Sequence, residues 1–183
     1  MSTLAKENVT ADELLALPSD GYRYELVQGA LKKMAPAGEQ HGEIAMALGW
    51  RLAQVVSERG LGKVYAAETG FKLRSDPDTV RAPDVAFVSR ARLGDTPPSR
   101  GFRRGPPDLA VEVVSPNDRP PEVAEKVYEW LLYGAAEIWV LDPERRSVTV
   151  YRPGEDLRIL GEGDALHSPL FPDWALPLGE LFA

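Results

Sequence analysis

Three side chains in this sequence could together carry out metal-assisted chemistry: Asp84, Glu112 and Lys126. Glu112 interrupts the apolar segment DLAVEVVSP (residues 108–116), and a carboxylate buried in such a segment is usually paired, protonated or bound to a metal. Asp84 directly follows Pro83 at the start of a second apolar segment, PDVAFV. Two neighbouring strands would bring both carboxylates together, and a hard cation such as Mg²⁺ or Mn²⁺ is the natural partner of such a pair.

Lys126 lies in a segment that predicts a helix, because SPNDRPPEVAEKVYEWLLYGA begins with Pro and Asn/Asp signals and ends at Gly134. At about 100° per residue, Lys126 falls on the flank of an apolar stripe, whereas Glu125 and Glu129 point away from it. The stripe consists of Val123, Val127, Trp130 and Leu131. A lysine on that flank can reach over the sheet edge to the carboxylates. Two carboxylates, a metal and an ammonium group can cleave phosphodiesters, because the metal activates water and the ammonium group stabilises negative charge.

Each of these residues also has a purely structural interpretation. A carboxylate in a strand can pair with an arginine or lysine, a Pro-Asp pair is typical of turns, and a lysine beside an apolar stripe can extend to solvent. His41, in the first turn of the helix expected in EQHGEIAMALGWRLAQVVSERG, either satisfies a free backbone group or has a functional role. Glu25, in the expected hairpin YRYELVQGALKKMAP, is either a cross-strand partner or a third carboxylate of the site.

The composition of the 183 residues is that of one globular domain, with a net charge of −7 and no cysteine. Disulfides and thiolate metal sites are therefore excluded. The N-terminus lacks the apolar core of a signal peptide, and no apolar stretch approaches the ~18 residues of a membrane-spanning helix, so we expect a cytoplasmic protein without membrane contact. The acidic balance excludes a generic nucleic-acid coat but not a local contact with nucleic acid.

The segment RARLGDTPPSRGFRRGPP (residues 90–107) is locally basic and rich in Pro and Gly, which predicts an exposed loop. Its arginines either decorate the surface or contact the phosphate groups of a nucleic acid. They are Arg90, Arg92, Arg100, Arg103 and Arg104.

The remaining segments predict one α+β (α/β-like) domain over residues 1–183. TADELLALP predicts a short helix before the hairpin, GKVYAAETGFKLR a strand bent near Gly70, and EIWVLD and SVTVYRP two strands joined by a turn. Together the patterns indicate a mixed sheet flanked by helices, with an added N-terminal helix and hairpin.

The sequence resembles the Uma family of restriction-endonuclease-like proteins, a branch of the PD-(D/E)xK nuclease superfamily. The most specific parts of the resemblance are YELVQGALKKMAPAGEQH, VRAPDVAFV, PDLAVEVVSPNDR and EKVYEWLLYGAAEIWVLDPERRSVTVYRP. The resemblance implies a restriction-endonuclease-like fold, Asp84 and Glu112 as metal-binding acids, and Glu25 and His41 near the active site. The superfamily pattern puts a lysine at position 114, where this chain has Val114. Relatives with this pattern supply the lysine from the following helix, a place that Lys126 fits.

The resemblance therefore implies a Mg²⁺- or Mn²⁺-dependent endonuclease that hydrolyses DNA, and it favours a homodimer that grips duplex DNA. The missing lysine and the acidic charge favour a second hypothesis, a non-catalytic binding or scaffold protein with the nuclease fold. In that case Glu112 is an uncompensated buried charge, and Glu112→Gln leaves the stability unchanged or improved. A third hypothesis is metal-dependent hydrolysis of a smaller phosphodiester.

Overall fold

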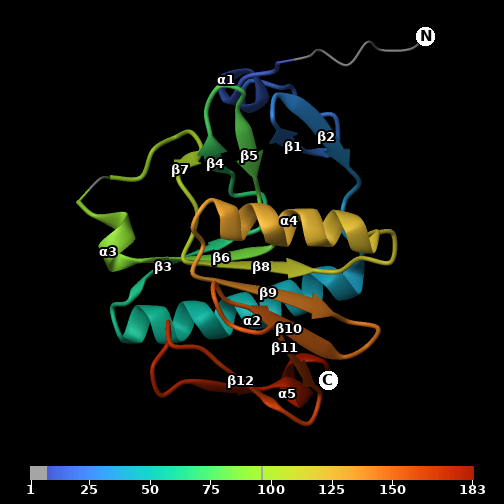
Figure 1. The fold of residues 1–183 in the computed structure, drawn as a ribbon, viewed down its shortest axis with the longest axis vertical. Coiled ribbons are helices and arrows are strands. Elements are labelled where there is room, and N and C mark those ends of the chain that lie inside the picture. Colours follow the sequence, from blue (N-terminus) through green and yellow to red (C-terminus); the bar gives the residue numbers. More distant parts are fainter. Residues whose placement is uncertain (1–7, 96) are drawn as a thin grey trace.

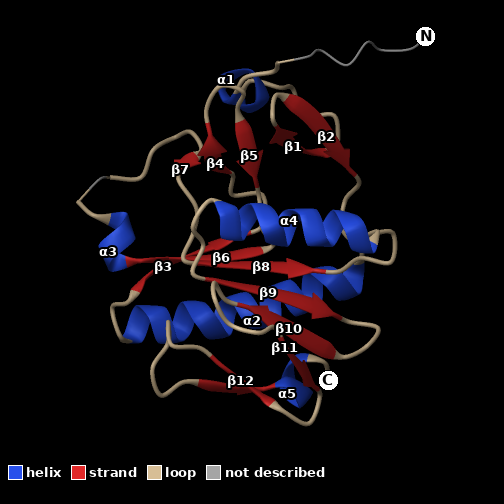
Figure 2. Ribbon diagram, in the orientation of Figure 1, coloured by secondary structure: helices blue, strands red, loops and turns tan. Residues whose placement is uncertain are grey.

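The computed structural model describes residues 8–95 and 97–183, which form an α+β domain (Figures 1 and 2). The helices are α1 (Ala11–Leu15), α2 (Glu39–Glu58), α3 (Arg90–Leu93), α4 (Pro120–Leu132) and α5 (Leu178–Leu181). The strands are β1 (Arg23–Val27), β2 (Ala30–Met34), β3 (Gly62–Ala66), β4 (Phe71–Arg74), β5 (Thr79–Arg81), β6 (Val85–Ser89), β7 (Arg103–Arg104), β8 (Leu109–Val113), β9 (Glu137–Asp142), β10 (Ser147–Tyr151), β11 (Arg158–Gly161), β12 (Ala165–His167) and β13 (Ala175–Pro177). In this described part of the chain, no helix is long and apolar enough to cross a membrane.

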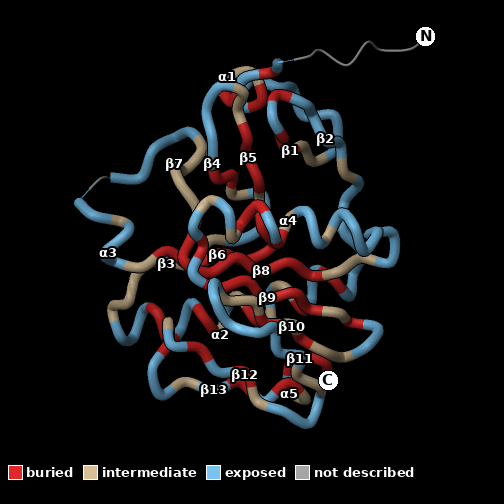
Figure 3. Tube along the Cα trace, in the orientation of Figure 1, coloured by how far each residue is buried: buried red, intermediate tan, exposed pale blue. Residues whose placement is uncertain are grey.

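A six-stranded mixed sheet with the order β11-β10-β9-β8-β6-β3 forms the centre of the molecule. Strands β8 and β9 are parallel because α4 carries the chain back across the sheet between them, whereas the other neighbours are antiparallel. Strand β8 lies between β6 and β9 and is buried along its whole length (Figure 3). A strand that is covered on both faces reads as a continuous apolar run, which explains the sequence of this segment.

The two faces of this sheet are covered by the two long helices. Helix α2 packs on one face through an apolar stripe that includes Ile44, Leu48 and Leu52, in contact with β6 and β8. Helix α4 packs on the other face through Val127 and Trp130. The two-stranded sheet β12-β13 and helix α5 complete the core on the α2 side.

Helix α4 is itself covered on its second side by a five-stranded sheet with the order β2-β1-β5-β4-β7 (Figure 1). The rings of Trp130 and of Phe71 in β4 pack nearly perpendicular to each other, with 6.2 Å between the ring centres. A helix between two sheets buries more than one stripe, and this arrangement decides where its charged residues lie.

The N-terminal hairpin predicted from the sequence is confirmed, with Gln28 and Gly29 in the turn between β1 and β2. Both turn residues have positive φ angles, 48° and 79°, as a tight two-residue hairpin requires. The segment GKVYAAETGFKLR, however, is not one bent strand. Strands β3 and β4 belong to different sheets, because a turn through Glu68, which also has a positive φ angle, redirects the chain. The arginine-rich segment is likewise not a plain loop, since it contains α3 and β7.

Candidate active site

The structure brings Asp84 and Glu112 to the same end of the neighbouring strands β6 and β8. Val85 lies opposite Val111, and the Asp84 N–H donates to the Val111 carbonyl oxygen at 2.9 Å. The Oδ2 atom of Asp84 accepts a hydrogen bond from the Val113 N–H at 2.8 Å, directly beside Glu112 in the chain. Both carboxylates are buried.

The Glu112 carboxylate has two partners, both on α4. The Lys126 ammonium group donates to Oε2 and the Trp130 indole N–H donates to Oε1, each at 2.9 Å. Lys126 therefore reaches the carboxylate from the flank of the apolar stripe. Because the charge of Glu112 is compensated within the protein, the assumption that it is an uncompensated buried charge is wrong.

The pKa values of Glu112 and Lys126 are shifted by burial and by the carboxylates that lie close to them. Burial raises the pKa of the Glu112 carboxyl; the neighbouring Lys126 opposes the rise, and the Asp84 and Glu25 carboxylates add to it. Burial alone would lower the pKa of Lys126, but its attraction to Glu112, Glu25 and Asp84 outweighs burial and raises that pKa. Three carboxylates thus act on one lysine, which stays charged.

His41 and Arg23 hold the Asp84 carboxylate from the other side. The Nε2 atom of His41, in the first turn of α2, lies 3.1 Å from Asp84 Oδ2. His41 is buried against this side chain, so the expectation that it satisfies a free backbone group is wrong. A guanidinium nitrogen of Arg23, at the start of β1, lies 3.8 Å from Asp84 Oδ1. The buried Nε atom of Arg23 has no acceptor among the described residues.

Glu25 belongs to a buried ion-pair chain that joins three elements. It accepts hydrogen bonds from an Arg81 guanidinium nitrogen at 2.7 Å and from the Ala82 N–H at 3.0 Å. The Nε atom of Arg81 also donates to Glu129 of α4 at 2.5 Å. Glu129, expected to point away from the apolar stripe, is nevertheless buried, because the second sheet covers its side of the helix as well. The chain fixes β1, β5 and α4 relative to one another around the site.

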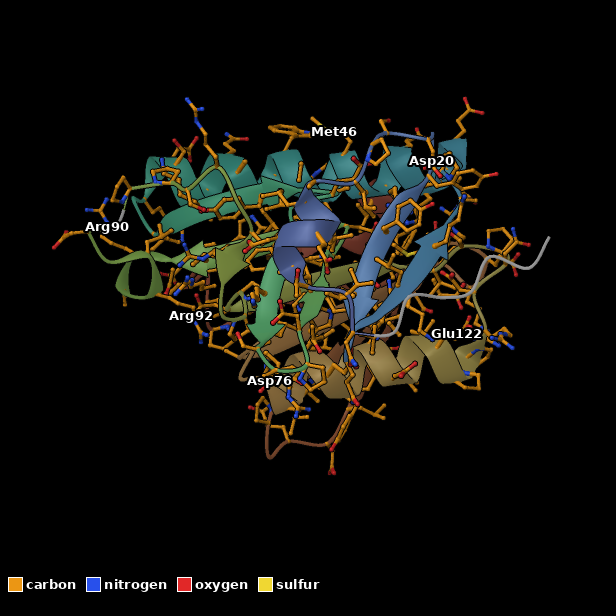
Figure 4. All side chains as sticks on the ribbon, turned by 90° about the horizontal axis from the view of Figure 1, so that it is seen from above. Asp20, Met46, Asp76, Arg90, Arg92 and Glu122 are labelled. Carbon is orange, nitrogen blue, oxygen red and sulfur yellow. The ribbon has the colours of Figure 1, made fainter. Side chains whose placement is uncertain are left out.

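The arginine-rich segment lies away from these residues. Arg92 pairs with Asp108 at the opposite end of β8 from Glu112, Arg90 donates to the Gly60 carbonyl oxygen, and Arg103 donates to the Arg92 carbonyl oxygen. In Figure 4, Arg90 and Arg92 lie at one end of the molecule, whereas Glu122, which borders the site, lies at the other. Three of the arginines thus stabilise their own segment and are not at the site.

Arg100 and Arg104 differ from these three, because both are exposed and neither side chain makes a hydrogen bond or an ion pair within the described residues. They are the two arginines of the segment that are free to contact a ligand.

A cavity of about 350 Å³ opens over the site, bordered by Glu25, His41, Arg81, Glu112 and Lys126. Within residues 8–95 and 97–183, no three His, Cys, Asp or Glu side chains are grouped so that they could hold a metal ion by themselves. Two carboxylates are nevertheless a suitable donor set for Mg²⁺, which keeps several waters and takes its other ligands from a substrate phosphate. Among the described residues, Asp84 Oδ1 accepts no hydrogen bond and has Arg23 at 3.8 Å as its ion-pair partner, so this oxygen could coordinate a metal. Asp84 and Glu112 therefore fit a divalent metal whose coordination the substrate completes.

The sequence interpretation missed three partners of the site, namely Arg23, Arg81 and Trp130. Arg81 stands between Val80 and Ala82 in VRAPD, so it is a charge within an apolar segment, the same signal that drew attention to Glu112. Trp130 was assigned to the apolar stripe, and its indole N–H gave no separate signal. Nothing in the pattern around Arg23 distinguishes it from a surface residue of a hairpin.

Comparison with known proteins identifies a matching family and a solved structure with a similar fold. The sequence profile of the family described as "Uma2: Putative restriction endonuclease" matches residues 11–179. A crystal structure titled as that of "a putative nuclease belonging to DUF820" from Anabaena variabilis has a TM-score of 0.80 with this structure, at 22% sequence identity, and the match covers 95% of this chain and 97% of that chain. The restriction-endonuclease-like fold predicted from the sequence is thereby confirmed. No curated protein matches this chain.

Proposed function

The chain belongs to the Uma2 family of restriction-endonuclease-like proteins, and on this premise we propose that it is a divalent-metal-dependent endonuclease that hydrolyses DNA phosphodiester bonds. The observation that carries the proposal is the convergence of Asp84, Glu112 and Lys126 at one buried corner. Holding several like charges together is costly for the folded protein, and groups with a perturbed pKa, as Glu112 and Lys126 have, cluster at functional sites.

Each residue of the corner has a proposed role. Asp84 and Glu112 would hold Mg²⁺ or Mn²⁺, which when bound lowers the pKa of a water ligand and neutralises phosphate charge. Lys126 orients the attacking water or stabilises the charge that develops on the phosphate. His41 fixes the orientation of the Asp84 carboxylate through Oδ2. Arg81 holds Glu25 in place beside them.

The phosphate contacts proposed for the arginine-rich segment are now restricted to Arg100 and Arg104. These two residues would contact the DNA backbone at a distance from the scissile bond. A homodimer and a cytoplasmic location stay predictions.

Titration calorimetry with Mn²⁺ and cleavage of plasmid DNA together test the proposal. The wild-type protein is expected to bind Mn²⁺ saturably and to cleave DNA only with a divalent metal. Asp84→Ala and Glu112→Gln are expected to lose both properties. Glu43→Gln, which removes an exposed carboxylate close to His41 in α2, is the matched control and should retain them. Unchanged cleavage by Asp84→Ala would reject the assignment.

One observation favours the alternative function, a non-catalytic binding or scaffold protein. Both oxygens of Glu112 already have hydrogen-bond donors from α4, so the pair is stable without a metal. This alternative predicts no Mn²⁺ binding and no metal-dependent activity in any of these proteins. Hydrolysis of a smaller phosphodiester predicts metal binding together with cleavage of nucleotide substrates but not of plasmid DNA.

A further inference from the structure

A second cavity, of about 710 Å³, lies beside the site between α2 and the edge strand β3. Small residues of α2, Gly42, Ala45 and Gly49, form its floor. Three large side chains at its border are exposed: Tyr22 is 50% exposed, Met46 67% and Trp50 49%, and the Lys33 ammonium group lies over the Tyr22 ring, 3.5 Å from its centre. Figure 4 shows Met46 on the outer side of α2. The cavity is thus a wide, mostly apolar hollow with aromatic rings at its border.

The two cavities share a wall. Arg23 and His41 border both of them, while Asp84 lines the larger cavity and Glu112 and Lys126 line the smaller one. The buried Nε atom of Arg23, which has no acceptor among the described residues, lies in this shared wall. A phosphate bound at Asp84 and Glu112 would therefore lie beside the Arg23 guanidinium group and next to the larger cavity.

We propose that the larger cavity receives an unpaired nucleobase of the substrate strand, next to the phosphate that is cleaved. This inference rests on the proposed function, because it takes the scissile phosphate to lie at Asp84 and Glu112. The volume is within the range of pockets that bind small organic groups, and it exceeds that of a single base. A base in an intact duplex is stacked on both sides and cannot enter, so the substrate class is single-stranded DNA or a duplex with an extruded or unpaired nucleotide.

The charge of the protein supports an unpaired base over a duplex. A net charge of −7 gives little affinity for a phosphate backbone, and Arg90, Arg92 and Arg103 are engaged in their own segment. Stacking of a base on an aromatic ring adds affinity without positive charge and accepts any base. Trp50, which is half exposed at the border of the cavity and has the Arg51 guanidinium group 5.6 Å from its ring centre, is the ring that would provide it.

Binding in EDTA tests this inference without requiring cleavage. The probe is a fluorescein-labelled oligothymidylate strand of about 15 nucleotides. It is compared with an abasic strand of the same length and with a duplex of the same length, by fluorescence anisotropy. The wild-type protein is expected to bind the oligothymidylate at least about ten-fold more tightly than either competitor, since stacking of each base contributes that order of affinity.

Two variants test the position of the base. Trp50→Ala removes the ring, and Gly42→Leu fills the cavity from a helix position where an added Cβ atom would meet no other atom within 4 Å. Each is expected to abolish the preference for oligothymidylate over the abasic strand. Tyr128→Ala is the matched control, because Tyr128 is an exposed aromatic residue of α4 that does not border the cavity. Circular dichroism shows whether each variant has folded.

The outcomes separate this inference from the nuclease proposal. Equal binding of the three probes, no binding of any probe, or a preference that survives both Trp50→Ala and Gly42→Leu would overturn it. So would a protein dimer that dissociates in these two variants, because a second copy would then occupy the hollow. A preference for oligothymidylate that persists in a wild-type protein without metal-dependent cleavage would support the base site and reject the nuclease.

Discussion

The two ends of strand β8 each carry a carboxylate with a basic partner, yet the two environments differ. Asp108, at the start of the strand, accepts hydrogen bonds from the Ser89 N–H at 2.7 Å and from Arg92 at 3.1 Å. It fastens the beginning of α3 to the sheet. Glu112, near the end of the strand, has Lys126 and Trp130 as partners but also faces the carboxylates of Asp84 and Glu25.

The difference between the two ends shows how a structural carboxylate is distinguished from a functional one. Asp108 accepts hydrogen bonds from Ser89 and Arg92 and so ties the start of α3 to the sheet, which explains its presence by the fold. The carboxylates around Glu112 repel one another, and their repulsion is unfavourable for folding. A fold gains nothing by gathering them beside a cavity, which is why this end of β8 is the candidate site.

Cleavage of DNA gives the largest expected difference between the two ends. Asp84→Asn is expected to lower the rate of cleavage about a thousand-fold, the upper end of the cost of removing one preorganised charged group from an active site. Asp108→Asn should leave the rate within about two-fold of the wild type, since no part of its interaction reaches the cavity. Initial rates on plasmid DNA with Mn²⁺ measure both, and comparable losses in the two variants would remove the distinction.

The free energy of unfolding gives the second difference. Lys126→Met leaves the buried Glu112 carboxylate, whose side chain is only 7% exposed, without its counter-charge, and we expect a loss of about 3 kcal/mol at neutral pH. The double variant Glu112→Gln with Lys126→Met removes the unpaired charge and should recover most of that loss. Asp108→Asn should cost about 1 kcal/mol. Urea denaturation measures all three, and a double variant that is no more stable than Lys126→Met alone would contradict the pairing.

The pH dependence of stability gives the third difference. The pKa of Glu112 is raised above its ordinary value of 4.5 in the folded protein, by burial first and then by Asp84 and Glu25 against the opposing effect of Lys126. Between pH 4.5 and the raised pKa, folded Glu112 keeps a proton that the unfolded chain releases. The free energy of unfolding of the metal-free protein should therefore fall as the pH rises through this window.

Asp84→Asn removes one of the charges that raise the pKa of Glu112, so the free energy of unfolding of this variant should fall less as the pH rises. Glu112→Gln removes the titrating group and should abolish this fall. Asp108→Asn should keep the wild-type fall. Urea denaturation in EDTA at several pH values provides the measurement, and parallel profiles for the wild type and Glu112→Gln would show that Glu112 does not titrate in this window.

The smallest expected effect concerns the arginine partner of Asp108. Arg92→Ala removes hydrogen bonds to Asp108 and to the carbonyl oxygens of Pro106 and Gly134. Because the side chain is 34% exposed, the loss of stability should be about 1 kcal/mol. The affinity for DNA should not change. A weaker affinity that depends on salt concentration would instead place Arg92 in contact with phosphate.

Much of the fold could be predicted from the sequence because its signals are local. Residues close together in the chain are enough to predict the turn at Gln28 and Gly29, the apolar stripe of α2 and the helix α4 that connects β8 to β9. The path from β3 to β4 could not be predicted, because a turn through Glu68 and a strand bend leave the same pattern in the sequence. Which sheet a strand joins depends on partners far away in the chain.

The residues of the candidate site also divide into those with a local signal in the sequence and those whose place depends on distant partners. Asp84, Glu112 and Lys126 carry local signals, as charges at fixed places in apolar segments. Glu129 could not be placed, since a wheel drawn for α4 alone does not show that a second sheet covers the helix. The same holds for Arg81, whose two partners are 56 and 48 residues away in the chain.

The return helix between β8 and β9 has a consequence for the order of folding. Glu112 and Lys126 are only 14 residues apart in the chain, whereas Glu25 meets Arg81 across 56 residues. The loop closed by the first pair is short, so its entropic cost is small and this pair can form early. The repelling carboxylates of Asp84 and Glu25 join only when the long-range contacts form. We therefore expect the unit from β8 to β9 to be structured in the folding transition state. The contacts of Asp84 and Glu25 with this unit should form only after the transition state.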